Sequence, residues 1–489
     1  MPENRRTLLN IQNMNVPASQ KRASALDALR GYAILTMVLS GTIADTLPRW
    51  MYHAQVPPPD HIFTPTVFGI TWVDLVFPFF LFAMGAAFPF SIGRKLEKGV
   101  TKGRVSLDCI VRGLQLAFFA IFLQHIYPFS LSDPQDYRAW FITLSGFVLL
   151  FPMFMRLPWN MAQWIRVAIK IGAYAVAFIM LLTIRYAHGK TFSLDYSNII
   201  ILVLANMAIF GSLAYIFTYK NKIARLAILP FVMAILLCMS GDFAGSWQKT
   251  FFDFTPFPWL YQFYYLKYLF IVIPGAIAGE YLLEWMNKKR TETNPMVKKE
   301  KRLAVALTFL TLAIITGNLY GLFTRQLVLN LFVTIVLSGI GIVLLYKTSS
   351  GFPELWKKFF TVGCYLLMLG LFFEAFEGGI RKDRSTFSYY FVTSGLAFMA
   401  LIFFSIVCDY FQWKKATSFL TMSGQNPMIA YVGSSVAVQP LLHITGLWQY
   451  VSKLSQGNAW EGLLQGVIIT GLVTLMTMFF TKIKWFWRT

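Results

Sequence analysis

Long apolar segments alternate with short polar ones along the whole chain. About fourteen of these apolar segments approach the roughly 20 residues that a helix needs to cross a bilayer. The pattern predicts an all-α polytopic membrane protein with about 14 (range about 12–14) transmembrane helices. The predicted spans are 26–47, 68–92, 106–127, 139–156, 163–184, 197–218, 224–241, 265–284, 302–323, 327–346, 359–375, 388–409, 427–444 and 460–481.

The basic residues are distributed unevenly between the two sides that this alternation defines. Of the 43 Lys and Arg residues, 30 lie in the terminal segments and in the loops after even-numbered spans. Because basic loops face the cytoplasm in membrane proteins, we expect both chain termini to be cytoplasmic. We also expect a cytoplasmic N-terminal segment, residues 1–24, whose polar composition is not that of a signal peptide, and then a single transmembrane domain, residues 25–489.

The composition supports a membrane protein and argues against nucleic-acid binding. Only 13% of the residues are charged, whereas soluble domains have about 25%. The net charge of +21 follows from the loop asymmetry and favours contact with anionic membrane lipids. We therefore expect lipids as partners and no nucleic acid. The four cysteines lack the spacing of metal ligands, so we expect neither a metal site nor a disulfide framework.

The segment from residue 51 to 91 contains the most informative polar side chains. His53 and His61 lie in a proline-rich loop, and Asp74 lies near the start of the following apolar span. A carboxylate inside hydrocarbon is costly unless it has a partner or a function. An aspartate beside a histidine fixes its tautomer and stabilises the imidazolium, as general-base histidines require. The alternative is that Asp74 caps its helix or pairs with a neighbouring helix for structure alone.

Several polar residues at the predicted cytoplasmic side could contact phosphate groups. Arg30 follows Asp27 by three residues in the first span, so the two can pair, and Arg30 could either extend to the interface or bind phosphate. Arg94 and Lys95 end the second span. Asn426 precedes Pro427 at a predicted helix start, where exposed N–H groups favour an anion.

A second basic cluster lies on the outer side, where basic residues are otherwise scarce. Arg381, Lys382 and Arg384 fall within one short loop before the span 388–409. The cluster is either a solvated loop tip or a binding site for an anionic or sugar ligand. Tyr and Trp side chains nearby would offer flat faces for sugar rings.

At these residues the sequence resembles the membrane-bound heparan-α-glucosaminide N-acetyltransferase family and its bacterial relatives. The similar regions fall within 26–92, 263–283 and 378–489. The motifs are LDALRG at 26–31, HA at 53–54 followed by GITWVDLVFPFFLFAMG at 69–85, TFSYYFVTSGLA at 386–397, GQNPMIAYVG at 424–433 and, more weakly, PGAIAG at 274–279 and KWFW at 484–487.

The resemblance implies an acetyltransferase in the cytoplasmic membrane of a bacterium. Acetyl would move from cytoplasmic acetyl-CoA, the co-substrate, to the amino group of a hexosamine or hexosamine-ended glycan on the outer side. The family's active histidine corresponds to His53, and its helix aspartate corresponds to Asp74. The inserted sequence PPPDH makes His61 a rival for the catalytic position.

The remaining expected contacts divide between the two sides of the membrane. A family asparagine is replaced here by Ser40, a candidate substrate contact together with Arg381, Lys382 and Arg384. The candidate acetyl-CoA contacts are Arg30, Arg94, Lys95 and Asn426. A homodimer stays an open alternative to a monomer.

The competing functional hypothesis is a transporter or flippase of a glycan or lipid-linked precursor. Apolar helices interrupted by Pro and Gly, with charges inside the membrane, also occur in transporters. The hydropathy pattern lacks an internal two-fold repeat, which favours the enzyme.

Overall fold

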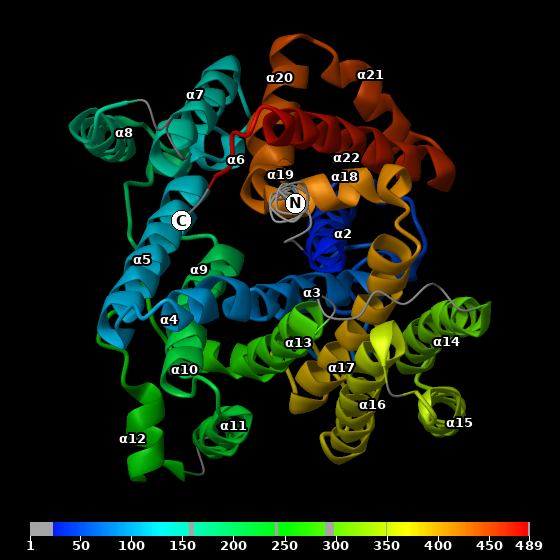
Figure 1. Ribbon diagram of the computed structural model, residues 1–489. Coiled ribbons are helices and arrows are strands. Elements are labelled where there is room, and N and C mark those ends of the chain that lie inside the picture. Colours follow the sequence, from blue (N-terminus) through cyan, green and yellow to red (C-terminus); the bar gives the residue numbers. More distant parts are fainter. Residues whose placement is uncertain (1–22, 156–160, 240–242, 289–297, 349, 488–489) are drawn as a thin grey trace, which may run out of the picture.

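The computed structural model describes residues 23–155, 161–239, 243–288, 298–348 and 350–487 (Figure 1). Within these ranges the regular elements are helices, and one isolated antiparallel bridge joins Met155 to Trp487. The predicted N-terminal segment 1–24 lies outside the described residues except for its last two positions.

The first half of the chain folds into a series of helices. They are α2 (Ser24–Ser40), α3 (Trp72–Ala86), α4 (Arg94–Glu97), α5 (Lys102–Ile126), α6 (Pro128–Leu131), α7 (Tyr137–Phe154), α8 (Gln163–Thr183), α9 (Ile199–Asn206), α10 (Ser212–Phe217), α11 (Lys222–Leu237) and α12 (Trp247–Asp253). Short π-helical turns at Pro89–Gly93 and Met207–Gly211 join α3 to α4 and α9 to α10.

The second half adds α13 (Leu269–Lys288), α14 (Lys298–Phe323), α15 (Leu327–Leu345), α16 (Gly351–Phe376), α17 (Phe387–Phe404), α18 (Lys414–Gln425), α19 (Pro427–Gly433), α20 (Gln439–Ile444), α21 (Trp448–Ser452) and α22 (Ala459–Lys482). π-Helical turns follow α17 at Ser405–Tyr410 and α19 at Ser434–Val438.

Eleven helices in the described part of the chain are long and apolar enough to cross a membrane. A twelfth crossing results if Pro427–Ile444 and Trp448–Gln456, which meet at a bend of 108°, form one span. The protein is therefore an all-helical integral membrane protein. The two other predicted spans, 26–47 and 224–241, form α2 with 17 residues and α11 with 16 residues, which are shorter than the rest.

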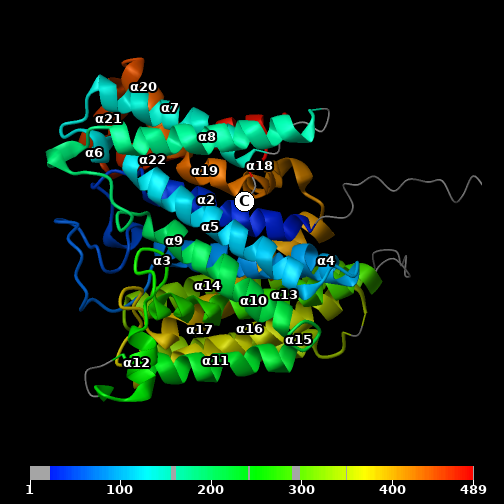
Figure 2. The ribbon, with the colours of Figure 1, turned by 90° about the vertical axis from the view of Figure 1, so that its left-hand side faces the viewer.

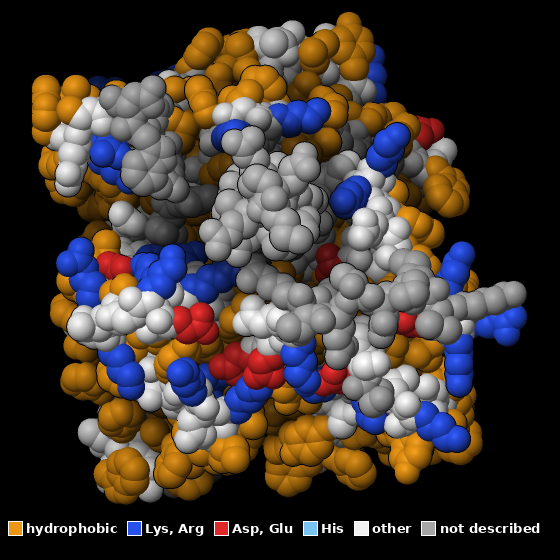
Figure 3. Space-filling view, viewed as in Figure 1, with side chains coloured by type: hydrophobic (Ala, Val, Ile, Leu, Met, Phe, Trp, Pro, Cys, Tyr) orange, Lys and Arg blue, Asp and Glu red, His pale blue; other side chains and the backbone are white. Residues whose placement is uncertain are grey.

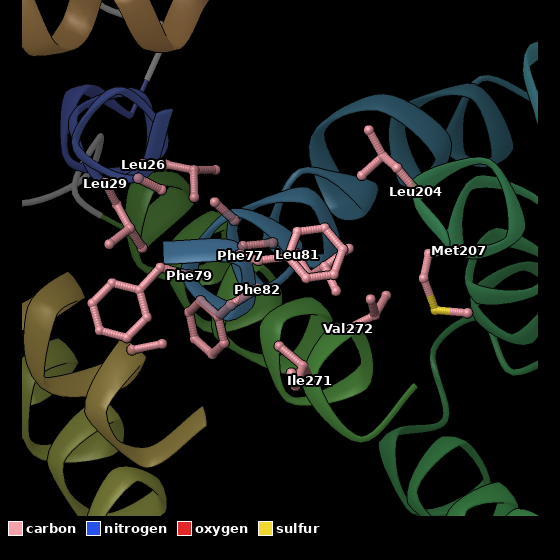
Figure 4. Packing of buried hydrophobic residues seen from close by; sticks show 14 of the residues in the cluster. Leu26, Leu29, Phe77, Phe79, Leu81, Phe82, Leu204, Met207, Ile271 and Val272 are labelled. Carbon is pink, nitrogen blue, oxygen red and sulfur yellow. The ribbon is translucent and has the colours of Figure 1, made fainter. Parts of the chain in front are cut away.

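The centre of the molecule is built from α2, α3, α13 and α17. Buried aromatic and aliphatic side chains fill the space between α2, α3 and α13, and Phe82, Ile271 and Val272 show this packing in Figure 4. Glycines allow α3 and α13 to approach until their backbones touch. A Cβ atom on Gly275 would overlap the carbonyl oxygen of Phe82, and one on Gly279 would overlap that of Ala86.

This contact predicts a strong effect of one methyl group. Gly275→Ala forces α3 and α13 apart because the clash is with backbone, and we expect it to destabilise the protein by about 1–3 kcal/mol, as overpacking does. The matched control is Gly172→Ala in α8, where a Cβ meets no atom within 4 Å. A lower Tm for Gly275→Ala than for Gly172→Ala in the same detergent is the expected result, and equal values would contradict the close crossing.

The two ends of the helix bundle have different characters. Figure 2 shows α4 at one end and the loop between α2 and α3, in blue, at the opposite end. Lys and Arg side chains gather with some acids on the α4 end, inside a rim of hydrophobic side chains (Figure 3). Because α3 runs from one end to the other, it separates its own first turn, with Asp74, from Arg94 and Lys95.

Candidate active site

Asp74 is the central residue of the site and has a structural task in its own right. It lies in the first turn of α3, and its Oδ2 atom accepts hydrogen bonds from the backbone N–H of Thr71 at 2.9 Å and that of Ala54 at 3.2 Å. The Thr71 hydroxyl donates to the carbonyl oxygen of Tyr52 at 2.7 Å. The capping box formed by Thr71 and Asp74 therefore also holds residues 52–54 against the start of the helix.

The second carboxylate oxygen of Asp74 is paired with His53. Asp74 Oδ1 lies 2.8 Å from Nδ1 of the imidazole. The Asp74 side chain is 2% exposed, whereas that of His53 is 37% exposed. A carboxylate accepts but does not donate, so Nδ1 carries the proton and Nε2 keeps an unprotonated lone pair. The buried partner thus orients an imidazole whose reactive edge can meet a ligand.

Lys382 completes a three-residue cluster. Its Nζ atom lies 3.1 Å from Nδ1 and 3.2 Å from Nε2 of His53. Burial lowers the pKa of Lys382, while the negative charges of Asp74 and Asp383 oppose that shift. The amine therefore loses its proton more readily than an ordinary lysine, and while protonated it disfavours a second positive charge on the imidazole.

The lowered pKa of Lys382 predicts how the stability of the protein depends on pH. A lysine with a lowered pKa in the folded state penalises folding at low pH, and the penalty disappears as the pH rises toward the unfolded value of about 10.4. The Tm of Lys382→Met relative to the parent should therefore be highest near pH 6 and should decrease toward pH 9. The control is Lys453→Met, at an exposed position. A pH-independent difference for Lys382→Met would contradict the assigned burial.

Two residues outside the expected set hold the cluster together. Gln55 binds the loop between α16 and α17 through both ends of its amide: Nε2 donates to the Asp383 carbonyl at 2.7 Å, and Oε1 accepts from the Asp383 N–H at 2.8 Å. The hydroxyl of Tyr389, in the first turn of α17, donates to the backbone carbonyl of Asp74 at 2.7 Å. Tyr389 falls within a family-like motif, whereas Gln55 has no signal in the sequence except its position two residues after His53.

His61 does not reach Asp74. Its Nε2 atom lies 3.7 Å from Oδ1 of Asp45, and its ring packs edge-on against Tyr52 with the centroids 4.6 Å apart. The backbone at His61 is left-handed, with φ of 49°. Of the two histidines in the loop, the structure brings His53 to the carboxylate and leaves His61 in the turn above it.

The remaining outer candidates are more distant from the imidazole or locally bonded. Ser40 donates to the carbonyl of Met37 at 2.9 Å, at the end of α2. The Arg381 guanidinium lies over the ring of Phe68, 5.1 Å from its centroid, and Arg384 is exposed. Only Lys382 of the predicted basic cluster has a described contact with His53.

The candidates at the α4 end are already engaged with protein groups. Arg30 donates to the carbonyls of Gly424 at 3.2 Å and Ala83 at 3.4 Å, and it pairs with Asp27 at 3.4 Å. Its guanidinium thus connects α2, α3 and α18. Lys95 pairs with Asp108 at 2.6 Å, and Arg94 lies over Phe90. Arg94 and Lys95 are at the molecular surface, while Arg30 braces helices.

Asn426 is buried and fastens the C-terminal segment. Its Nδ2 atom donates to the carbonyl of Trp485 at 2.8 Å, and its Oδ1 atom accepts from the N–H of Trp487 at 3.3 Å. It precedes α19 as predicted, but its side chain caps no N–H group of that helix. A direct contact with a nucleotide would require the amide to exchange these partners.

The described residues contain no group of three or more His, Cys, Asp or Glu side chains that could hold a metal ion.

Comparison with protein families gives a match to the family described as "Domain of unknown function (DUF5009)". The match covers residues 22–282, which is more than half of the chain. The protein belongs to this family. No curated protein matches the sequence. The DUF5009 region includes His53 and Asp74, whereas Lys382 lies beyond it.

Proposed function

We propose that this DUF5009 protein is a transmembrane acetyltransferase. It would move acetyl from cytoplasmic acetyl-CoA to the amino group of a hexosamine, or of a hexosamine-ended glycan, on the outer side of a bacterial cytoplasmic membrane. The supporting observation is the buried Asp74 carboxylate that orients a half-exposed His53 at the end of the bundle opposite to α4. The resemblance to the heparan-α-glucosaminide N-acetyltransferase family supports the choice of reaction.

The unprotonated Nε2 atom of His53, once the substrate replaces Lys382 beside it, fits the proton transfer that the reaction needs. When an amine attacks a thioester, a C–N bond forms, the C–S bond breaks, and the amine must lose a proton. Nε2 can accept that proton and return it to the departing CoA thiolate. Alternatively, Nε2 attacks first and holds the acetyl group until the amine displaces it. In both routes Asp74 stabilises the positive charge that develops on the ring.

Lys382 supports either route by electrostatics. A protonated Lys382 beside the ring disfavours the imidazolium before the substrate arrives, so Nε2 stays unprotonated and able to react. The side-chain amide of Gln55 bonds to the backbone of Asp383, the residue after Lys382, and so fixes the loop that carries the lysine next to the imidazole. Lys382 is a positioning and charge-tuning residue in this scheme.

The proposed topology has about 14 crossings and both termini in the cytoplasm. The α4 end would then be cytoplasmic, as its many Lys and Arg side chains favour (Figure 3). The nucleotide of acetyl-CoA is multiply charged and cannot enter hydrocarbon unaided. Arg94 and Lys95 would hold it at that end, with the pantetheine arm extending toward His53 between α2, α3, α17 and α19, where Arg30 and Asn426 brace the helices.

Arg94 gives the cleaner test of the nucleotide position, because Arg30 also braces three helices. Arg94→Ala should raise the KM for acetyl-CoA about fivefold and change kcat little, since a phosphate contact far from the thioester contributes uniform binding. Lys102→Ala, an exposed basic residue at the start of α5, is the matched control. An unchanged KM for Arg94→Ala would place the nucleotide elsewhere.

The sidedness of the reaction tests the whole scheme. Right-side-out and inverted vesicles are loaded or bathed with radiolabelled acetyl-CoA and glucosamine on chosen faces. We expect N-acetylglucosamine only when acetyl-CoA is on the cytoplasmic face and the sugar is on the other. Product that requires both on one face would contradict transmembrane transfer. Sugar accumulation without dependence on acetyl-CoA would support the transporter or flippase instead.

A further inference from the structure

A groove lined by arginines and aromatic rings lies at the same end of the molecule as His53. It is formed where the loop between α2 and α3 meets the turn between α14 and α15. Its lining includes Arg49, Trp50, Phe68, Phe323 and Arg325. The acetyl-transfer scheme assigns no role to these five residues.

The guanidinium groups in and beside the groove lie over aromatic faces. Arg49 lies over the ring of Phe323, 5.6 Å from its centroid, and Arg325 lies over Phe68 at 5.5 Å. Arg381 lies over the same Phe68 ring at 5.1 Å. Three positive groups therefore share two rings within one small region.

The acidic groups near these arginines do not balance their charge. Arg325 pairs with Glu374 of α16, which is buried. In the described part of the chain, Arg49 forms no ion pair, and the buried Nε atom of Arg381 has no hydrogen-bond partner. Because a buried donor without a partner is costly, this surplus of positive charge and N–H groups indicates an anionic ligand.

The groove is continuous with the proposed active site through the backbone. Arg49 precedes His53 by four residues in the same loop, and Arg381 is adjacent to Lys382. The N–H of Gly69, next to Phe68, donates to the carbonyl of Ile380 at 2.9 Å. The loop that carries His53 therefore also lines the groove, and the loop that carries Lys382 packs against it.

The opposite wall is the end of a helix pair whose outer surface is strongly apolar. On α14 and α15, large side chains such as Phe309, Val328 and Phe332 are at least 65% exposed, as expected for helices in contact with lipid. The groove thus opens at the level where such a hairpin would leave the bilayer. Trp50, 54% exposed in the lining, is the residue type found at that interface.

We propose that this groove binds a phosphate group of the acceptor at the outer membrane interface. The guanidinium fork matches the oxygens of a phosphate in a bidentate manner, and the aromatic faces suit the apolar side of a sugar ring or of an acyl chain. This inference rests on the proposed acetyl transfer, because the acceptor is the amino sugar that receives the acetyl group. The phosphate belongs either to a soluble amino-sugar phosphate or to a lipid that carries the sugar.

Binding without catalysis tests the groove. The full chain is reconstituted in phosphatidylcholine nanodiscs, and the Kd values of glucosamine 1-phosphate and glucosamine are measured by calorimetry without acetyl-CoA. We expect the phosphate to bind at least about tenfold more tightly, the difference of one charge-assisted contact. Arg49→Gln should remove that difference, and Arg325→Lys, which keeps the charge near Glu374, should reduce it. The exposed Arg185→Gln, on another loop, is the matched control.

Nanodiscs that contain phosphatidylglycerol distinguish the two sources of phosphate. If lipid phosphate occupies the groove, the anionic lipid should weaken glucosamine 1-phosphate binding in the parent and not in Arg49→Gln. Equal affinities for glucosamine and its phosphate, with no effect of the anionic lipid, would overturn the proposal. These binding measurements need no acetyl transfer. A groove that does not bind phosphate would therefore leave the proposed acetyl transfer at His53 intact. A protein that binds glucosamine 1-phosphate but never releases CoA would refute only the enzymatic function.

Discussion

His53→Ala is expected to reduce kcat for CoA release with glucosamine by about 10²–10⁴-fold, the usual contribution of a positioned acid–base group. The reason is geometric: His53 is the histidine whose Nδ1 atom contacts the buried Asp74, at 2.8 Å. The alanine leaves Asp74 with its backbone donors from Thr71 and Ala54, so the start of α3 should keep its structure. Purified protein in detergent, assayed for free thiol, provides the measurement.

His61→Ala is the matched control, because it removes an imidazole from the same loop, eight residues away. It should keep kcat within about threefold of the parent, since His61 contacts Tyr52 and Asp45 and not Asp74. Full turnover in His53→Ala together with loss in His61→Ala would show that the wrong histidine was chosen. Full turnover in both would exclude histidine chemistry at this site.

Asp74→Asn should affect both rate and stability. An asparagine can still accept hydrogen bonds from Thr71 and Ala54 through its oxygen, but its NH₂ group then faces His53 and can only donate. The imidazole must then adopt the tautomer in which Nδ1 accepts a hydrogen bond from that group. In this tautomer Nε2 is protonated and cannot take a proton from the substrate. We expect kcat to fall by about 10²–10⁴-fold, because a wrong tautomer disables a histidine base to a similar degree.

The rate effect of Asp74→Asn is separated from its effect on folding by measuring Tm in parallel. The loss of a charged cap should cost about 1 kcal/mol, far less than would be needed to unfold the chain at room temperature. Asp45→Asn, which changes the carboxylate near His61, should leave kcat within about threefold. An Asp74→Asn protein with full kcat would reduce Asp74 to a helix cap.

The fold was largely predictable because a span needs only length and apolarity. In the part of the chain that the structure describes, each predicted apolar segment contains helix, and the differences concern length, as in α2 and α11, and the bend near Ile444. Those features depend on neighbouring helices. The number of crossings therefore stays a prediction, while the helical, membrane-spanning architecture is confirmed.

The candidate site was predictable only where its partners are close in sequence. His53 and Asp74 are only 21 residues apart, in a loop and in the first turn of the helix that follows it. Their pairing could therefore be proposed from the residue types and from the predicted depth of both in the membrane. Lys382 is 329 residues from His53, and no periodicity indicates which loop of a polytopic protein folds over which. At Asn426 the sequence correctly indicated the start of a helix but not the contacts of the side chain. Tertiary packing places its amide against the backbone of the C-terminal segment.

The two hydrogen bonds between Gln55 and Asp383 also imply an order of events in time. Chains are synthesised and inserted from the N-terminus, and early segments fold before late ones exist. The His53–Asp74 pair can therefore form while the ribosome is still far from residue 383, but the lysine and its loop arrive only after three-quarters of the chain has been made. The reactive centre would stay incomplete until late in biogenesis, and a nascent protein arrested before α17 should be folded around α3 and catalytically silent.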